Sequence, residues 1–309
     1  MDPLSEVLTL LKPASFGFRG LDARGAWRLE FGATGGIKAF AVEAGTCWMT
    51  IEGGEPTRLG PGDMVLLPGR TAFRLFSSDG AEPIDAYPFF SSVPVGTVAS
   101  LHGGGECFGV GGFFDFEGRH AALILDVLPS LIMIRAETTR AALGVLIGRL
   151  MKELREPQPG GALIAGHLAQ SLLIEALRLH LADDSANGRG WLAGLRDRRI
   201  GSVLAAMHAD PARAWTLVDL SRTAGMSRSS FAARFKQVVG EGALEYLTRW
   251  RMIVAADKLA QGRTTLAAVA PMVGYASESA FGMAFKRVLG QSPRQFVNHL
   301  GSGCAIGPG

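Results

Sequence analysis

The spacing of hydrophobic residues changes character near residue 118. Before it, short β-type runs such as "WRLEF", "IKAFAVE", "CWMTIE" and "MVLLP" alternate with turns rich in glycine and proline. "GG" at Gly53–Gly54 predicts a hairpin turn between two of these strands. Many short strands with such turns are typical of a barrel or sandwich, so residues 1–118 are predicted to form a β-barrel of the jelly-roll type.

Helical spacing follows. Between Thr139 and Glu156 leucine and isoleucine recur every three or four residues, and residues 162–182 carry a second, broader apolar stripe. "PQPGG" separates the two, which predicts a helical hairpin within residues 119–184. The hairpin packs either on the barrel or on a second subunit, and we expect it to serve dimerisation. We place a polar linker at 185–197, with the boundary in "DDSANGRG".

The C-terminal third is predicted to consist of short helices, and one of them occurs twice. "SRSSFAARFKQVVG" begins at Ser227 and "SESAFGMAFKRVLG" at Ser277, with the same residue at seven of fourteen positions. In each copy a serine can cap the helix and a glycine can end it. Phe231, Phe235 and Val238 are predicted to face inward, as are the corresponding Phe281, Phe285 and Val288.

The opposite face of each repeated helix is polar or small. A short helix, a glycine turn and a capped second helix is the layout that sets a recognition helix into a major groove, and two copies could reach segments about 34 Å apart. One such unit alone is more often an ordinary helical hairpin; the doubling favours DNA. The outward residues are Ser229, Ala232, Ala233 and Lys236, then Ser279, Gly282, Met283 and Lys286; the predicted phosphate contacts are Arg228, Arg234, Lys236, Lys286, Arg287 and the helix N-termini at Ser227 and Ser277.

Charge agrees with this interpretation. The 309 residues carry a formal charge of +3, but residues 191–300 hold 15 lysines and arginines against 7 acidic residues. The remainder is therefore mildly acidic. A basic segment attached to an acidic one is typical of a nucleic-acid-binding module joined to another domain, although a solvated basic face would look the same.

With these motifs, residues 198–300 resemble the AraC/XylS family of bacterial transcriptional regulators. The resemblance includes a linker-helix motif "YL…RM..A…L" from Tyr246 to Leu259 and a closing "G.SP..F" from Gly290 to Phe296. It implies a DNA-binding domain with two helix-turn-helix units and a flexible tail at 301–309. It also implies contact with RNA polymerase, usually as an activator.

The same resemblance implies base-reading positions. Relatives commonly have arginine where Ala233 and Met283 stand, and arginine pairs bidentately with guanine. We therefore expect DNA shape and apolar contacts to carry more of the specificity here. The base-reading positions implied by the family are Ser229, Ala232 and Ala233 in the first helix, and Glu278, Ser279, Gly282 and Met283 in the second.

Residues 3–185 resemble the cupin-type sensor domain of one branch of these regulators, notably through "GPGDMVLLPGRTAF". Aligned to metal-binding cupins, Ala41, Glu43, Cys47 and Phe73 occupy the ligand positions, and one carboxylate cannot hold an ion. We expect no metal and no cofactor. The sequence leaves two alternatives: an apolar pocket for a small-molecule effector, or plain core. The residues concerned are Phe40, Cys47, Trp48, Met49 and Phe73.

Other features narrow the function. No catalytic serine–histidine–carboxylate set can be assembled from spacing, so we expect no enzyme. Three scattered cysteines indicate a reducing cytoplasm, and Cys107, beside glycines, is either reactive or buried and inert. We expect no signal peptide and no membrane span. The prediction is a cytoplasmic, homodimeric regulator that binds double-stranded DNA; the alternatives are a cupin metalloenzyme with a helical appendage and an effector-independent DNA-binding dimer.

Overall fold

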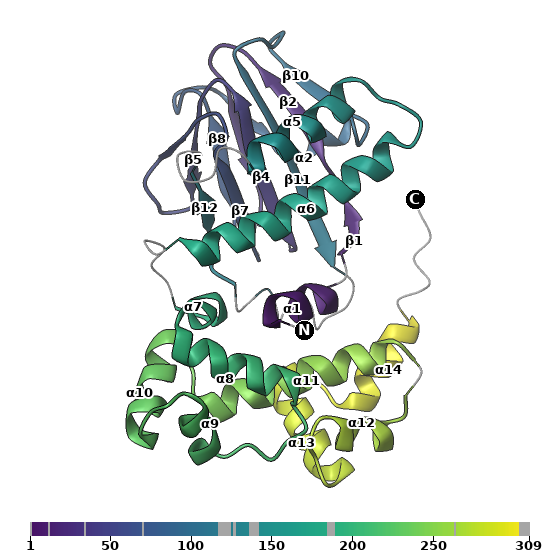
Figure 1. Ribbon diagram of the computed structural model, residues 1–309. Coiled ribbons are helices and arrows are strands. Elements are labelled where there is room, and N and C mark those ends of the chain that lie inside the picture. The colour runs from purple at the N-terminus through teal and green to yellow at the C-terminus, as the bar shows by residue number, and fades with distance from the viewer. Residues whose placement is uncertain are drawn as a thin grey trace. The chain divides into compact units, whose positions relative to one another are not determined.

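A computed structural model describes residues 2–11, 13–33, 35–69, 71–116, 125, 128–135, 142–183, 189–262 and 264–302. Within these ranges the chain divides into two compact units, drawn in Figure 1. The strand unit contains residues 13–116, 129–135 and 142–183. The helical unit contains residues 2–11, 125, 128 and 189–302.

The strand unit consists of two sheets and confirms the predicted cupin-type β-fold. Its strands are β1 (Pro13–Phe16), β2 (Arg19–Ala23), β3 (Arg28–Phe31), β4 (Ile37–Ala44), β5 (Cys47–Ile51), β6 (Thr57–Leu59), β7 (Met64–Pro68), β8 (Phe73–Phe76), β9 (Pro83–Asp85), β10 (Val98–Leu101), β11 (Cys107–Phe116) and β12 (Ile132–Ile134). The first sheet has the order β10-β2-β11-β4-β7-β12, with β1 paired to β11, and the second has the order β6-β5-β8-β3-β9. In the described ranges these strands form two sheets and not one closed barrel.

The main core lies between the sheets. It takes alternate residues of the strands, such as Leu29 of β3, Val42 of β4 and Met49 of β5, all 0–1% exposed. The predicted hairpin turn is confirmed: β5 and β6 pair antiparallel around Gly53, whose φ of 76° suits glycine. The short helix α2 (Ala86–Ser91) covers one edge, where Ala86 is buried.

The predicted helical hairpin is α5 (Ala142–Arg155) and α6 (Gly161–Ala182), and it packs on the seven-stranded sheet (Figure 1). Because the helices cover the outer face of this sheet, β7 is buried on both faces along its whole length. The predicted start of the hairpin at Thr139 lies outside the described residues. Among the described helices, α6 passes a length-and-composition test for a membrane span, as core helices of soluble proteins also do.

The helical unit is built from nine described helices. They are α1 (Pro3–Leu11), α7 (Trp191–Arg196), α8 (Arg198–Ala209), α9 (Leu217–Thr223), α10 (Arg228–Val239), α11 (Ala243–Ala260), α12 (Leu266–Met272), α13 (Glu278–Leu289) and α14 (Pro293–Ser302). Two of them differ from the sequence-based expectation. Helix α7 lies in the stretch predicted to be a linker, where Trp191 is buried, and α1 belongs to the helical unit, where it packs on α8.

A buried histidine on α8, His208, contacts α1. The His208 ring of α8 stacks on Trp250 with centroids 3.7 Å apart, and its Nε2 shares a 2.6 Å hydrogen bond with the Tyr246 hydroxyl. Its Nδ1 lies 3.3 Å from a carboxylate oxygen of Glu6 on α1, without hydrogen-bond geometry. Burial lowers the pKa of His208, and the Glu6 carboxylate opposes this shift in part.

Candidate nucleic-acid interface

The two repeated helices, α10 and α13, begin and end in the same way. Ser227 accepts a hydrogen bond from the Ser230 amide, and Ser277 accepts one from the Ala280 amide. Both helices end at a glycine in the left-handed conformation, Gly240 with φ 95° and Gly290 with φ 73°. The sequence therefore predicted both limits of each helix correctly, because caps are local interactions.

Each repeated helix follows a shorter capped helix and a glycine turn. Thr216 and Asp219 form a reciprocal capping box at the start of α9, and Thr265 caps α12. The turn glycine of the second unit is constrained: Gly274 has φ 79°, and a Cβ atom there would lie 2.5 Å from the Ala212 carbonyl oxygen. Pro271 does not shorten α12, which has seven residues like α9. Two helix-turn-helix units are thus present.

Paired phenylalanines hold the repeated helices in place. Phe231 and Phe235 are fully buried and meet edge to face at 5.7 Å, and Phe281 and Phe285 repeat this at 5.5 Å. The prediction for the third inward position was wrong for Val238, which is half-buried, whereas Val288 is half-buried but packs against the core of the second unit. In the first copy Val239 is buried instead, so the inward stripe follows i, i+4, i+8 and not i, i+4, i+7.

The predicted outward faces are open to solvent. Ala232 and Gly282 are half-buried, and Met283, 68% exposed, is one of the largest apolar side chains on the surface. Both faces therefore remain available to a partner. The exposed members are Ser227, Arg228, Ser229, Ala233, Arg234 and Lys236 on the first unit, and Ser277, Glu278, Ser279, Met283, Lys286 and Arg287 on the second.

Arg234 has a structural contact that the sequence did not reveal. Its Nε donates to Asp197 Oδ2 at 2.9 Å, and the same aspartate caps α8 by accepting from the Arg199 and Ile200 amides. These hydrogen bonds and the charge of Arg234 outweigh burial and lower the pKa of Asp197. Because its guanidinium is tied to α8, Arg234 is a poorer candidate for a phosphate contact than sequence suggested.

Helix α11 joins the two units, and Arg251 on it contacts both. Its guanidinium donates to the Pro211 carbonyl at 2.6 Å and to the Arg213 carbonyl at 2.7 Å, in the loop that leads to α9. It also lies over the Tyr275 ring at 5.8 Å, directly after the Gly274 turn of the second unit. In the sequence Arg251 is only the arginine of the linker-helix motif, because hydrogen bonds across 38–40 residues leave no local signal.

In the strand unit, the five predicted pocket residues do not lie on one side. Phe40, Cys47, Met49 and Phe73 belong to the core between the sheets, whereas Trp48 is 39% exposed on the other face of β5. The prediction for Trp48 was wrong because successive strand residues point to opposite faces. Whether the other four bind a ligand stays a prediction.

The positions aligned to cupin metal ligands do not converge either. Val42 points into the core, so its neighbours Ala41 and Glu43 lie on the opposite face of β4, where Glu43 pairs with Arg155 of α5. Cys47 and Phe73 lie inside. In the parts of the chain that the structure describes, no three histidine, cysteine, aspartate or glutamate side chains are grouped to hold a metal ion.

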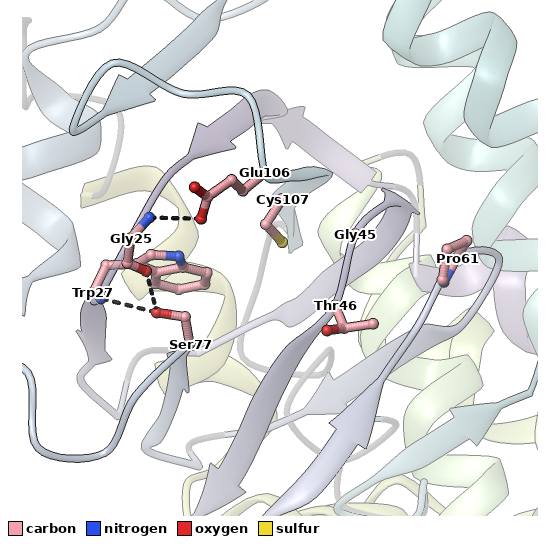
Figure 2. A pocket seen from close by; sticks show the side chains of 8 residues that line it. All are labelled: Gly25, Trp27, Gly45, Thr46, Pro61, Ser77, Glu106 and Cys107. Carbon is pink, nitrogen blue, oxygen red and sulfur yellow. Dashed lines mark hydrogen bonds between the residues drawn. The ribbon is translucent and has the colours of Figure 1, made fainter.

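A cavity of about 430 Å³ does occur in the strand unit (Figure 2). A hydrogen-bonded frame shapes it: the Gly25 amide donates to Glu106 at 2.9 Å, and the Ser77 hydroxyl donates to the Gly25 carbonyl at 2.7 Å. Trp27 and Cys107 are its buried members. Sequence reasoning missed this pocket, whose lining is Gly25, Trp27, Gly45, Thr46, Pro61, Ser77, Glu106 and Cys107.

Comparison with known proteins identifies both domains. A cupin family model matches residues 2–182, and a helix-turn-helix domain model matches residues 220–299. An AraC-like transcription regulator of Streptomyces lividans is 43% identical over 97% of this chain and 99% of its own. The HTH-type transcriptional regulator AlkR of Acinetobacter baylyi is 31% identical over 96% of this chain and 99% of its own.

Among solved structures, the DNA-binding domain of AdpA in complex with a target DNA aligns with 35% of this chain and 96% of its own, at 26% identity and a TM-score of 0.33. That likeness is too distant to add to the assignment. The full-length sequence matches and the two domain matches carry it. The chain therefore belongs to the AraC family of DNA-binding transcription regulators, with a cupin domain before its helix-turn-helix domain.

Proposed function

We propose that this regulator binds double-stranded DNA by placing α10 and α13 in successive segments of the major groove. One observation carries the proposal: two matched, capped helices present exposed faces beside exposed cations, and one helix, α11, joins them. With 18 residues, α11 is about 27 Å long, which is close to the roughly 34 Å that separates equivalent groove segments.

The exposed residues divide into two roles. Cations beside the helices neutralise phosphates and set the register, whereas the outward positions meet base edges. Neither helix carries arginine at the positions where relatives have it, and Met283 offers an apolar side chain suited to a thymine methyl group. The proposed phosphate contacts are Arg228, Lys236, Lys286 and Arg287, with the amides that follow Ser227 and Ser277; the proposed base contacts are Ser229, Ala232, Ala233, Glu278, Ser279, Gly282 and Met283.

Salt dependence tests the phosphate assignment. A duplex selected from random DNA with the full chain supplies the ligand, and affinity is measured over a range of salt concentrations. Each lost phosphate contact should reduce the slope of log K against log salt by about 1, so Lys236→Ala with Lys286→Ala should reduce it by about 2. Lys152→Ala, an exposed lysine on α5, removes a charge from the strand unit and serves as the control. An unchanged slope in the double variant would refute the assignment.

We further propose that the strand unit binds a small-molecule effector and that the chain acts as a homodimer. The cavity of about 430 Å³ is within the size range of small-molecule sites and supports the first. Val145 on α5 and Leu163 on α6, 71% and 72% exposed, support the second, because burial of exposed apolar side chains against a partner is favourable.

Thermal-shift screening of the full chain against metabolites tests the effector, since a compound that binds the native state raises the melting temperature. No shift with any compound would favour the effector-independent dimer. Sedimentation tests the dimer: the parent protein should sediment as a dimer and Leu163→Glu as a monomer. A parent protein that sediments as a monomer would refute the proposal. Activation of transcription through RNA polymerase is tested in vitro on a template that carries the selected duplex. The chain should raise the amount of transcript.

A further inference from the structure

Two buried cysteines meet across the sheets of the strand unit. Cys47 opens β5 in the five-stranded sheet, and Cys107 opens β11 in the seven-stranded sheet. Both are free thiols, 1% and 3% exposed, and both belong to the core between the sheets. A core needs only apolar volume at these positions, yet two thiols occupy them.

A glycine allows the two strand starts to approach each other. Gly45 has φ 77°, and a Cβ atom there would lie 2.9 Å from the Cys107 Cα and 2.0 Å from the Glu106 carbonyl oxygen. The turn before β5 therefore lies directly against the start of β11. Cys47 comes two residues after this contact, and its side chain lies with that of Cys107 in the core between the sheets.

The two thiols are chemically different. Their mutual hydrogen bond lowers the pKa of Cys107, whereas the same bond and burial raise the pKa of Cys47. Cys107 is therefore the sulfur that ionises first, with Cys47 as its hydrogen-bond donor. Thiolates, and not thiols, are the nucleophiles in cysteine oxidation.

The same cysteine has a route to solvent. Cys107 is among the lining residues of the cavity in Figure 2, together with the exposed Thr46 and Pro61, whereas Cys47 is not among them. Figure 2 shows its sulfur between Glu106 and Gly45. A small polar molecule in the cavity would thus meet Cys107 first and Cys47 only behind it.

We propose that Cys107 and Cys47 form a redox-active dithiol, which a hydroperoxide entering this cavity converts to a disulfide. The Cys107 thiolate attacks the peroxide, so that an S–O bond forms and the O–O bond breaks. With hydrogen peroxide, the departing oxygen takes up the proton that Cys107 lost and leaves as water. The Cys47 sulfur then displaces the hydroxyl of the sulfenic acid, which leaves as a second water with the Cys47 proton. Two thiols supply the two electrons that reduce the peroxide.

The test uses the full chain with Cys304→Ser, so that Cys47 and Cys107 are its remaining cysteines. The protein is treated with hydrogen peroxide, unfolded, alkylated with iodoacetamide and digested without reduction. We expect loss of both alkylation sites, a peptide pair joined through Cys47 and Cys107, and recovery of both thiols with dithiothreitol. The proposal is wrong if both thiols stay alkylatable, or if Cys107 is oxidised further to sulfinic acid with no link to Cys47.

Matched variants separate the two roles. Cys47→Ser and Cys47→Ala both abolish the link, so Cys107 should accumulate sulfenic acid that dimedone traps. The serine keeps a hydrogen-bond donor and the alanine does not, so trapping should be faster in Cys47→Ser, by about tenfold for each unit by which the pKa of Cys107 differs between them. Equal rates in two folded variants would overturn the donor role of Cys47, and circular dichroism of each variant checks its folding.

Discussion

Replacing Arg251 should weaken binding to a complete operator and leave binding to half of one almost unchanged. Its two hydrogen bonds, at 2.6 and 2.7 Å, tie α11 to the loop before α9, and its cation–π contact reaches the start of the second unit. Arg251→Ala removes all three contacts. We expect the two helix-turn-helix units to lose their fixed spacing while each remains folded around its own phenylalanine pair.

The magnitude follows from the exposure of the partners. A hydrogen bond from a charged donor contributes about 1.5–3 kcal/mol, but Pro211 is half-buried and Arg213 exposed, so water replaces much of what is lost. We therefore expect Arg251→Ala to remove about 2 kcal/mol of the free energy that holds the two units at their spacing. If DNA must restore the spacing, affinity for a duplex that engages both units falls about 30-fold.

Titration of fluorescent duplexes with the full chain measures this. One duplex carries the complete selected site, and a second has the half read by α13 scrambled. We expect Arg251→Ala to weaken binding to the first duplex and to leave the second almost unchanged, with Arg251→Lys in between because a lysine cannot donate to both carbonyls in the same way. Arg249→Ala, which loses the same charge but pairs with Glu241 instead, should weaken both duplexes equally. Equal losses on both duplexes for Arg251→Ala would refute its role in spacing.

Three other expectations follow from the helical unit. Because burial lowers the pKa of His208, the unfolded chain takes up a proton below about pH 6.5 that the folded chain resists. The free energy of unfolding should therefore have its full value above that pH and fall below it by up to about 1.4 kcal/mol per pH unit. Urea unfolding followed by tryptophan fluorescence measures this, and His208→Gln should flatten the pH profile. Met283→Arg should add a preference for guanine worth about 1–3 kcal/mol at one position in a selection from random DNA, and a motif identical to that of the parent would contradict the placement of α13. Ser277→Ala should lower the free energy of unfolding by about 1 kcal/mol because the α13 cap is lost, whereas Ser277→Asn should lower it little. Hydrogen exchange of the Ala280 amide, which the cap binds, measures the difference.

Much of the DNA-binding unit could be predicted because its signals are local. A serine that caps the amide three residues later, a glycine that ends a helix and phenylalanines one turn apart all act within a few residues of one another. The doubling of that pattern predicted two helix-turn-helix units. The error at Val238 also has a local cause: i+7 and i+8 both lie near the inward stripe of a helix, and tertiary packing chose Val239.

The strand unit was harder to predict in detail. Residues on a strand alternate between faces, so an alignment displaced by one residue moves every side chain to the other side. This is why Trp48 lies outside and why Ala41 and Glu43 face the helices and not the core. The cavity around Trp27 and Cys107 combines five separate segments of the chain, and no pattern within one segment could indicate it.

The sequence by itself determined most of the strands and helices and the paired, basic helices, because these depend on periodicity, capping and composition. The two domain types followed from the resemblance of its motifs to a known family. Only the tertiary structure decided which distant groups meet: α1 with His208, Arg234 with Asp197, Arg251 with the loop before α9, and Cys47 with Cys107. Each of these contacts joins residues at least 37 positions apart. Their partners are set by how whole elements pack in three dimensions, which no short stretch of the chain records.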